Sequence, residues 1–392
     1  MQFADRLKPL GSNVFADMDT AKAAANRAGQ TILDLSLGSS DLPTAPHILE
    51  AIAAALNDPG THGYALFRDI GDMRAAAATW VERRFGASVD PDAEVMPLIG
   101  SQEGTAHLPL AILNPGDFAL LLDPGYPSHY GGVHLAGGQI YGMPLLAENA
   151  FLPVFDDIPT PVLAQSKLMV LSYPHNPTTA IASREFFDRA VQFCQTHNLV
   201  LVHDFPYVDF VFDGSTPPSI LQSDRERSVS IEFFTMSKSY SMGGFRIGFA
   251  VGNRQLISAL RQIKAVVDFN QYRGIMRGAI AALLGDRTEV TRSTDIFRQR
   301  RDAMVAALHE IGWQIPTPPS TMYLWAKLPE QWARDSVKFC MDLVQTTGVA
   351  LSPGAGFGKY GEGYVRFALV HDPEVLRLAA QKIGEFIHKT AI

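Results

Sequence analysis

The residues between Thr235 and Arg246 combine a lysine with groups that suit a phosphate. Lys238 follows residues 230–234, an apolar run typical of a buried strand. An amine in a low-dielectric pocket loses its proton and becomes a nucleophile towards carbonyl carbon. Hydroxyl side chains precede this lysine and Arg246 follows it, and both kinds of group bind phosphate. The stretch predicts a lysine that reacts beside a bound phosphate, although alone it is equally compatible with a solvated Ser/Lys loop.

Other polar side chains come directly after short apolar runs. In an open parallel sheet, the carboxyl ends of the strands form the edge where ligands bind. One polar residue after a strand is an ordinary turn residue, whereas several compatible ones at the same edge indicate a site. Besides Lys238, the residues in this position are Ser101, Tyr126, Asn176 and Asp204, after predicted strands at 94–99, 117–122, 167–172 and 199–202.

These residue types match the parts of one cofactor, pyridoxal phosphate (PLP). Asp204 could pair with a protonated pyridine nitrogen, and Tyr207 and Asn176 could donate to the phenolate oxygen. Tyr126 could stack on the flat ring. Each residue also has an ordinary role open to it, as a cap, a core aromatic, a turn residue or a loop aromatic. Together they predict PLP held as a Schiff base by Lys238.

Two further stretches could bind anionic groups. Residues 100–104 precede a helix whose free backbone N–H groups would hold a phosphate, although a plain helix start with Ser101 as N-cap is equally compatible. The forked guanidinium of Arg366 suits a carboxylate, although such an arginine usually makes a surface ion pair. The glycine-rich residues 354–361 lack the strand-turn-helix context of a dinucleotide loop, so we expect a flexible turn or lid there.

Composition excludes several other classes of protein. The 392-residue chain is 47% apolar, and its net charge of −7 provides no basic field for nucleic acid. We find no signal-peptide pattern and no apolar run long enough to span a membrane, so we expect a soluble cytoplasmic protein. Its two cysteines are too few for a zinc site, and His129 and His134 lack both helical spacing and a third ligand. We expect no metal.

Apolar runs alternate with helical patterns between residues 93 and 252, which favours strands buried on both faces. We therefore expect an α/β fold with a mostly parallel sheet sandwiched by helices, plus a smaller α+β domain. The expected division is 1–45 for an N-terminal arm and part of the small domain, 46–285 for the large domain, and 286–392 for the small domain. Helices are expected at residues 46–56, 69–85, 255–285, 288–311, 335–347 and 373–389.

The joint pattern resembles the PLP-dependent aminotransferases of fold type I, class I/II. The resemblance covers nearly the whole chain. Within the family, residues 100–104 and 352–358 are most similar to the branch that contains LL-diaminopimelate aminotransferase and bacterial alanine aminotransferases. The residues that carry the resemblance occur in the family's order: Gly125-Tyr126, Asn176-Pro177, Asp204 with Tyr207, the lysine stretch and Arg366.

The resemblance implies a role for each matching residue. Lys238 would be the Schiff-base lysine and proton shuttle, Asp204 the partner of the pyridine nitrogen, and Tyr126 the stacking ring. Asn176 and Tyr207 would be the ligands of the cofactor's O3′ atom. Tyr64 would reach the phosphate of the neighbouring subunit, which implies a homodimer with shared sites. The phosphate cup would comprise Ser101, Gln102, Thr235, Ser237 and Arg246, and the α-carboxylate site would comprise Arg366, Asn176 and the Gly38 backbone.

Several positions depart from the residues usual in the family. Ser39-Ser40 replace an Asp-Pro pair, Gln102 replaces a lysine, and Thr179 replaces a glycine. These changes leave the cofactor residues intact but bear on the substrate. Arg273 falls where, in this family, one subunit reaches into the site of the other, and it could bind a distal carboxylate. An ordinary helix-start arginine is the alternative.

The implied activity moves an amino group between an L-amino acid and a 2-oxo acid. Glutamate, aspartate, alanine or a diaminopimelate-type compound would be the donor. A C–S β-lyase on the same fold is an alternative that would need no oxo-acid acceptor. A PLP-sensing regulatory protein is a third reading, which the absence of a basic helix-turn-helix pattern disfavours.

Overall fold

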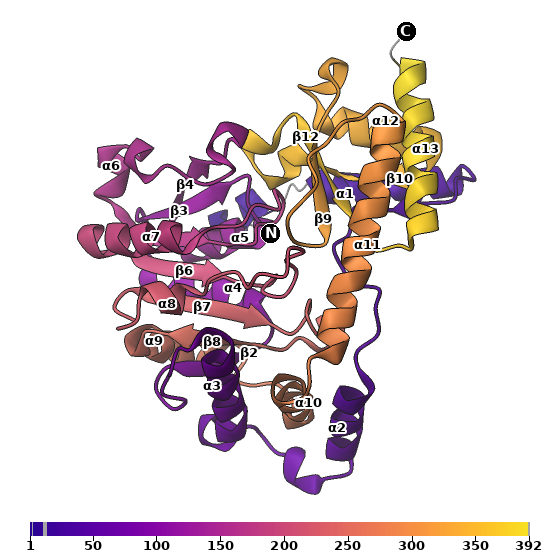
Figure 1. Cartoon of the computed structure of the whole chain (residues 1–392). Helices are drawn as coiled ribbons and strands as arrows, with labels where there is room; N and C mark the ends of the chain where they lie inside the picture. The colour runs from indigo at the N-terminus through magenta and orange to yellow at the C-terminus, as the bar shows by residue number, and fades with distance from the viewer. Residues whose placement is uncertain (2, 11–13, 391–392) are drawn as a thin grey trace.

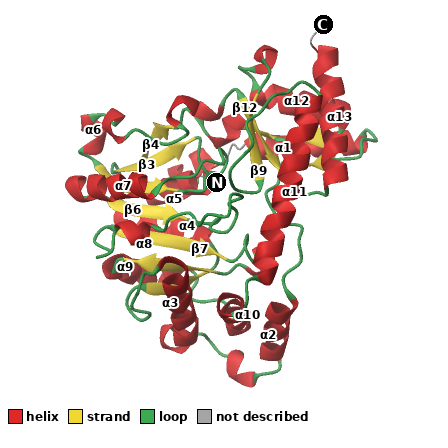
Figure 2. Ribbon diagram, in the orientation of Figure 1, coloured by secondary structure: helices red, strands yellow, loops and turns green. Residues whose placement is uncertain are grey.

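The computed structural model describes residues 1, 3–10 and 14–390. They form a large region on a seven-stranded sheet and a smaller region on a three-stranded sheet with a two-stranded pair beside it (Figure 1). Figure 2 shows helices packed around the large sheet, with the long helix α11 (Thr288–Glu310) running towards the smaller region. The expected α/β class with a mostly parallel sheet is confirmed.

The large sheet has the strand order β2-β8-β7-β6-β5-β3-β4. Strands β3 to β7 are mutually parallel, and β8 runs antiparallel to both of its neighbours. The carboxyl ends of the parallel strands therefore share one edge. The strands are β2 (Val95–Leu98), β3 (Phe118–Asp123), β4 (Gln139–Pro144), β5 (Ser166–Leu171), β6 (Val200–Asp204), β7 (Ser230–Thr235) and β8 (Gly248–Gly252).

Alternate residues of the strands pack on opposite faces of the sheet, because successive side chains of a strand point in opposite directions. Leu120 of β3 lies in a core cluster with Trp80 on one face, and its neighbour Leu121 lies in a second cluster with Leu108 on the other face. The central strands are therefore apolar at consecutive positions. The helices of the large region are α2 (Pro46–Leu56), α3 (Gly71–Phe85), α4 (Ser101–Ile112), α5 (Pro127–Ala136), α6 (Thr160–Leu163), α7 (Arg184–His197), α8 (Ile220–Ser223), α9 (Arg254–Val267) and α10 (Arg273–Leu284).

The smaller region has its own core. Its three-stranded antiparallel sheet has the order β11-β12-β9, and β1 pairs in parallel with β10. Met18 of the first helix and Phe297 of α11 lie in the same core cluster, so the N-terminal helix packs with the C-terminal third of the chain. The elements are α1 (Val14–Arg27), β1 (Leu33–Asp34), β9 (Tyr323–Lys327), α12 (Ser336–Thr347), β10 (Val349–Ala350), β11 (Ser352–Pro353), β12 (Tyr364–Ala368) and α13 (Pro373–Thr390).

The structure differs from the sequence expectations in three places. The helix expected at 255–285 is two helices, because residues 268–272 leave the helical path and Phe269 adopts a φ of 61°. The edge strand β4 and the antiparallel strand β8 were not expected. Residues 354–361, expected as a flexible turn or lid, form two short 3₁₀ helices, and the Tyr360 N–H donates to the Asp123 carboxylate at 3.0 Å.

Among the residues described, no helix is long and apolar enough to cross a membrane.

Candidate active site

A cavity of about 550 Å³ lies at the carboxyl ends of the parallel strands, where it meets the smaller region. Asp204 and Thr235, the last residues of β6 and β7, line it together with Arg366 of β12. The cavity brings together most residues of the expected site. Those lining it are Gly38, Ser101, Gln102, Tyr126, Asn176, Asp204, Tyr207, Thr235, Ser237, Lys238, Arg246 and Arg366.

One end of the cavity has the groups of an anion site. Ser101 begins α4, whose first backbone N–H groups have no partner within the helix. Gly100, with a φ of 71°, leads into this helix, and a β-carbon there would lie 2.7 Å from the Arg246 guanidinium. Thr235 donates from its hydroxyl to that of Ser237 at 2.9 Å. Guanidinium, hydroxyls and a helix N-terminus converge, as a phosphate requires.

Lys238 lines the cavity just beyond the end of β7. Its Nζ donates to the carbonyl oxygen of Gly38 at 2.5 Å and lies 5.8 Å from the centre of the Tyr207 ring. Gly38 follows the N-terminal strand β1, so this contact joins the loop beyond the large sheet to the smaller region. The amine therefore lines the same cavity as the anion site and Arg366, where it can reach the carbonyl carbon of a bound ligand.

Asp204 is buried and uses only one of its carboxylate oxygens. Its Oδ2 lies 3.0 Å from Nε2 of His129, which is also buried. Its Oδ1 has no hydrogen-bond partner among the described residues. A buried carboxylate oxygen left unpaired is costly, so this atom fits a partner such as the protonated nitrogen of a pyridine ring. On this observation the residues present fit PLP.

His129 is a part of the site that sequence reasoning missed, because it was weighed only as a metal ligand. Its ring packs edge-on against Tyr126 at 5.6 Å between centroids. Tyr126 is the N-cap of α5 and His129 lies three residues later in its first turn, an interval that brings the two side chains to the same side of the helix start. This three-residue interval was the feature of the sequence that could have linked His129 to the site. His129 orients Asp204, and Tyr126 covers the same wall of the cavity.

Arg366 is held rigidly at the other end of the cavity. Its guanidinium donates to Asn176 Oδ1 at 2.9 Å and to the Ser36 carbonyl at 2.7 Å. It lies between the rings of Tyr323 and Phe357, at 4.3 and 4.7 Å from their centres. A buried arginine with no carboxylate partner in the described chain suits an anionic ligand such as a substrate carboxylate. The surface ion pair considered for this residue is not formed.

Two groups of cavity residues were not anticipated. Tyr323 comes from β9, and its hydroxyl lies 2.9 Å from that of Tyr207. The helix α1 contributes a further wall through Phe15, Met18, Asp19 and Lys22. Nothing in the sequence near these residues connects them to the site, because their position depends on how the smaller region folds against the large sheet.

Tyr64 and Arg273 lie away from this cavity. Tyr64 is 89% exposed, and its ring approaches Phe269 at 6.3 Å between centroids. Arg273 begins α10 and donates to the Gly60 carbonyl at 2.9 Å. Both residues were expected to act on a neighbouring subunit, and that role stays a prediction.

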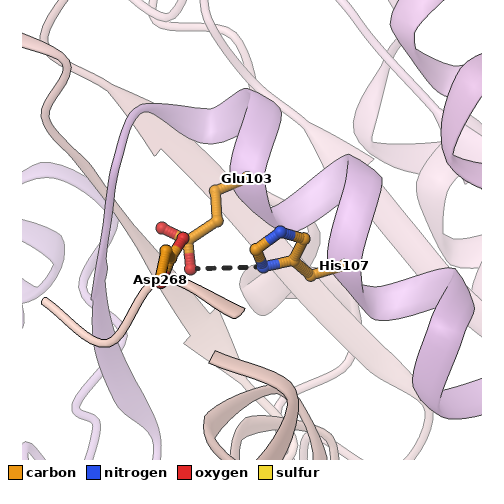
Figure 3. A group of neighbouring side chains, drawn as sticks. All are labelled: Glu103, His107 and Asp268. Atoms are coloured by element: carbon orange, nitrogen blue, oxygen red, sulfur yellow. Dashed lines mark ion pairs between the residues drawn. The ribbon is translucent and has the colours of Figure 1, made fainter. Parts of the chain in front are cut away.

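Three side chains of the kinds that bind metal ions cluster behind the anion site, on α4 and the segment after α9 (Figure 3). Glu103, His107 and Asp268 offer ligand atoms within 4.8 Å of one another. The ammonium of Lys264 lies 2.9 and 2.8 Å from the two Glu103 oxygens and 2.9 Å from Asp268. This buried lysine supplies the positive charge, so the group is an ion-pair cluster.

The chain belongs to the class I and II aminotransferases. A profile described as "Aminotransferase class I and II" matches residues 30–383. The chain is 40% identical to LL-diaminopimelate aminotransferase of Dehalococcoides mccartyi, over 98% of this chain and 99% of that one. It is 41% identical to glutamate-pyruvate aminotransferase AlaC of Escherichia coli, over 97% and 92% of the two chains.

The fold agrees with that membership. A structure of the probable N-succinyldiaminopimelate aminotransferase from Thermus thermophilus superimposes with a TM-score of 0.90 at 41% identity, covering 95% of this chain and 99% of that one. The protein is a PLP-dependent transaminase, as the resemblance implied. The relatives named here are aminotransferases, and this supports transamination over the C–S β-lyase and PLP-sensing alternatives.

Proposed function

We propose that Lys238 bonds covalently to the PLP aldehyde and carries the proton that transamination moves. PLP, when bound, supplies an electron sink for the bond that loses this proton. The supporting observation is that the Lys238 amine lines the same cavity as the anion site, Arg366 and the buried, unpaired Oδ1 of Asp204. Ser101, Gln102, Thr235, Ser237 and Arg246 would hold the phosphate.

The remaining residues would orient the ring and the substrate. Asp204, kept in place by His129, would hold the pyridine nitrogen in its protonated form, and Tyr126 would stack on the ring. Tyr207 and Asn176 would donate to the phenolate oxygen. Arg366, with Asn176 and the Gly38 backbone, would bind the α-carboxylate and so fix which substrate proton faces Lys238.

The test is to locate the covalent bond. Wild-type protein loaded with PLP and treated with borohydride is expected to carry the label on the peptide that contains Lys238. Lys238→Ala is expected to lose the label and all measurable transfer, whereas Lys327→Ala, at an exposed position, should keep both. A label on another lysine of the wild-type protein would contradict the proposal.

We further propose a diaminopimelate-type donor, which has an amino-acid group at both ends. The supporting observation is a charge pair on the α1 wall of the cavity. The Lys22 ammonium contacts Asp19 at 2.7 Å and Asp34 at 2.9 Å. Lys22 also lies 3.4 Å from the Ser36 hydroxyl, and Arg366 donates to the carbonyl of that serine. An ammonium and a carboxylate side by side complement a distal end that carries both charges.

The donor proposal predicts a selective loss in Asp19→Asn. We expect kcat/KM for diaminopimelate to fall by about tenfold, as for one lost charge-assisted hydrogen bond, and kcat/KM for alanine to stay unchanged. Asp17→Asn, on the same helix but outside the cavity, is the matched control. Equal losses for both donors, or a wild-type enzyme that prefers glutamate through Arg273, would contradict it.

We also infer that the active form is a homodimer. Tyr64 is 89% exposed, and Val266 and Val267, at the end of α9, are 88% and 56% exposed. The Tyr64 ring approaches Phe269 at 6.3 Å between centroids, and Phe269 lies just beyond the end of α9 that carries the two valines. A second copy of the chain would cover this surface and place Tyr64 near its anion site. The cytoplasmic location expected from the sequence stays a prediction.

A further inference from the structure

Tyr323 lines the cavity and has no role in the function proposed above, yet its hydroxyl makes a hydrogen bond to a residue of the proposed cofactor site. Its oxygen lies 2.9 Å from the Tyr207 oxygen, and both side chains are at least 98% buried. Their rings meet edge-on at 5.7 Å between centroids. Tyr323 belongs to β9 of the smaller region, whereas Tyr207 follows β6 of the large sheet. The pair is therefore a hydrogen bond between the two regions, made inside the cavity.

The Tyr323 hydroxyl is fixed in place from two sides. A β-carbon on Gly38 would overlap this hydroxyl, so the backbone beside Lys238 packs directly against it. The guanidinium of Arg366 covers the ring at 4.3 Å from its centre. The side chain cannot turn away without displacing Gly38 or Arg366, and both lie in the α-carboxylate site. A hydroxyl fixed this tightly can determine where its neighbour's proton points.

Each phenol has one proton to donate, so the pair forms a directional chain. We propose that Tyr323 is a positioning residue: its hydroxyl donates to the Tyr207 oxygen and thereby turns the Tyr207 proton towards the phenolate oxygen of bound PLP. The proposal rests on the role proposed above for Tyr207. In this chain, Tyr207 accepts one hydrogen bond and donates another, and such consecutive bonds strengthen one another.

The charges around the pair favour this direction. Burial opposes ionisation of Tyr323, but the cations of Lys238 and Arg366, together with the hydrogen bond to Tyr207, outweigh it and bring the pKa of Tyr323 below its ordinary value. Burial and the neighbouring Tyr323 raise the pKa of Tyr207 well above its ordinary value. The more acidic phenol is the better donor, and the less acidic one keeps its proton at working pH. If the single proton of Tyr207 is donated to the PLP oxygen, as in the role proposed above, the 2.9 Å contact between the two hydroxyls must use the proton of Tyr323.

The test follows the visible absorbance of PLP-loaded enzyme as a function of pH. A hydrogen bond donated to the phenolate oxygen stabilises its negative charge, so the charge attracts the proton on the lysine-bound nitrogen less strongly. The pKa of that nitrogen is therefore lower when the donor is present. In Tyr323→Phe, which keeps the ring under Arg366, we expect the absorbance midpoint to rise by about half a pH unit to one unit. We expect a lower kcat, with KM for the amino donor unchanged within about twofold.

Three further variants separate the possible outcomes. Tyr207→Phe should raise the midpoint at least as far, and the double variant should match Tyr207→Phe, because Tyr323 acts only through Tyr207. Tyr364→Phe, a small-region tyrosine outside the cavity, should leave the midpoint unchanged. If the absorbance midpoint shifts in Tyr207→Phe but not in Tyr323→Phe, this inference is overturned while the role of Tyr207 stands. The same holds if the shifts of the two single variants add in the double variant. An unshifted Tyr207→Phe would also overturn the proposed role of Tyr207.

Discussion

His175 shows how strongly single residues around Asp204 are constrained by burial. It precedes Asn176, its Nδ1 lies 2.7 Å from the Thr178 hydroxyl, and its Nε2 has no partner in the described chain. Burial, assisted by the neighbouring His129, lowers the pKa of His175 to about 3. The imidazole therefore stays neutral at any working pH. A neutral ring here adds no positive charge beside His129, which holds Asp204.

This shift predicts a pH-dependent stability. Below the ordinary histidine pKa of about 6.5, the unfolded chain binds a proton that folded His175 rejects, so stability falls as pH falls from that value towards 3. Relative to His175→Gln, which cannot titrate, the wild-type unfolding free energy should drop by about 1–2 kcal/mol between pH 6.5 and 5. Urea unfolding of both proteins at each pH measures the two free energies of unfolding. A difference between them that does not change with pH would contradict the prediction.

At the scale of elements, the ion-pair cluster ties α9 to the start of α4. Glu103 is the third residue of α4, and its Oε2 also accepts from the Ile99 N–H at 2.6 Å, before the helix begins. Lys264 of α9 holds both oxygens of this carboxylate. The turn that presents Ser101 to the cavity is therefore fixed from behind. An anion site built on a helix N-terminus needs such support, because its donors are backbone groups.

Removing the lysine should affect both stability and the anion site. In Lys264→Met, Glu103 becomes a buried unpaired charge, and we expect a loss of about 3–5 kcal/mol in unfolding free energy. We also expect weaker PLP binding, measured as a higher Kd, with KM for the amino donor little changed. Adding Glu103→Leu removes the unpaired charge and should recover much of the stability. If Lys264→Met leaves both quantities at the wild-type value, the cluster does not support the site.

The elements that sequence could predict are those whose signal is local. Strands β3, β5 and β6 are buried on both faces, and each contains an unbroken apolar run, at residues 118–122, 168–171 and 200–202, that is visible in the sequence. The edge strand β4 is only partly buried, and its residues Gln139, Tyr141 and Gly142 interrupt the pattern. The break between α9 and α10 depends on Gln271 and Asn270, whose side chains bond to backbone carbonyls of Leu98 and Ala65. Those partners are distant in sequence, so the break has no local signature.

At the scale of the whole molecule, the site exists only where the two regions meet. Lys238 and Asp204 could be recognised because each follows a buried strand, which is a property of the sequence. Tyr323 and the α1 residues Asp19 and Lys22 could not, because the packing of the smaller region places them. That packing is held in part by Arg300 of α11, which donates to both oxygens of Asp41 at 2.6 and 2.8 Å. Asp41 lies in the segment beyond Gly38, so this ion pair also steadies the α-carboxylate site.

The proposed homodimer makes the largest-scale prediction, that two defective chains can repair each other. Lys238→Ala keeps Tyr64 but lacks the reactive amine, and Tyr64→Ala keeps the amine. If Tyr64 serves the partner's site, a mixed dimer has one site with both residues intact. Random exchange makes about half of the dimers mixed, so activity should rise to about one quarter of the wild-type value. Unmixed Tyr64→Ala should bind PLP more weakly than wild type, because it lacks the side chain that would reach the phosphate in the partner's site.

The mixing experiment needs subunit exchange under mild denaturant followed by dialysis, with transfer activity measured per total chain. Mixing Tyr64→Ala with the double variant Lys238→Ala/Tyr64→Ala is the matched control. It undergoes the same exchange but offers no intact Tyr64, so it should show no gain. Recovery in the first mixture alone would require both a dimer and a Tyr64 that acts across it. If the two mixtures give equal activity, Tyr64 acts within its own chain or not at all, and the exposed surface around Val266 must have another explanation.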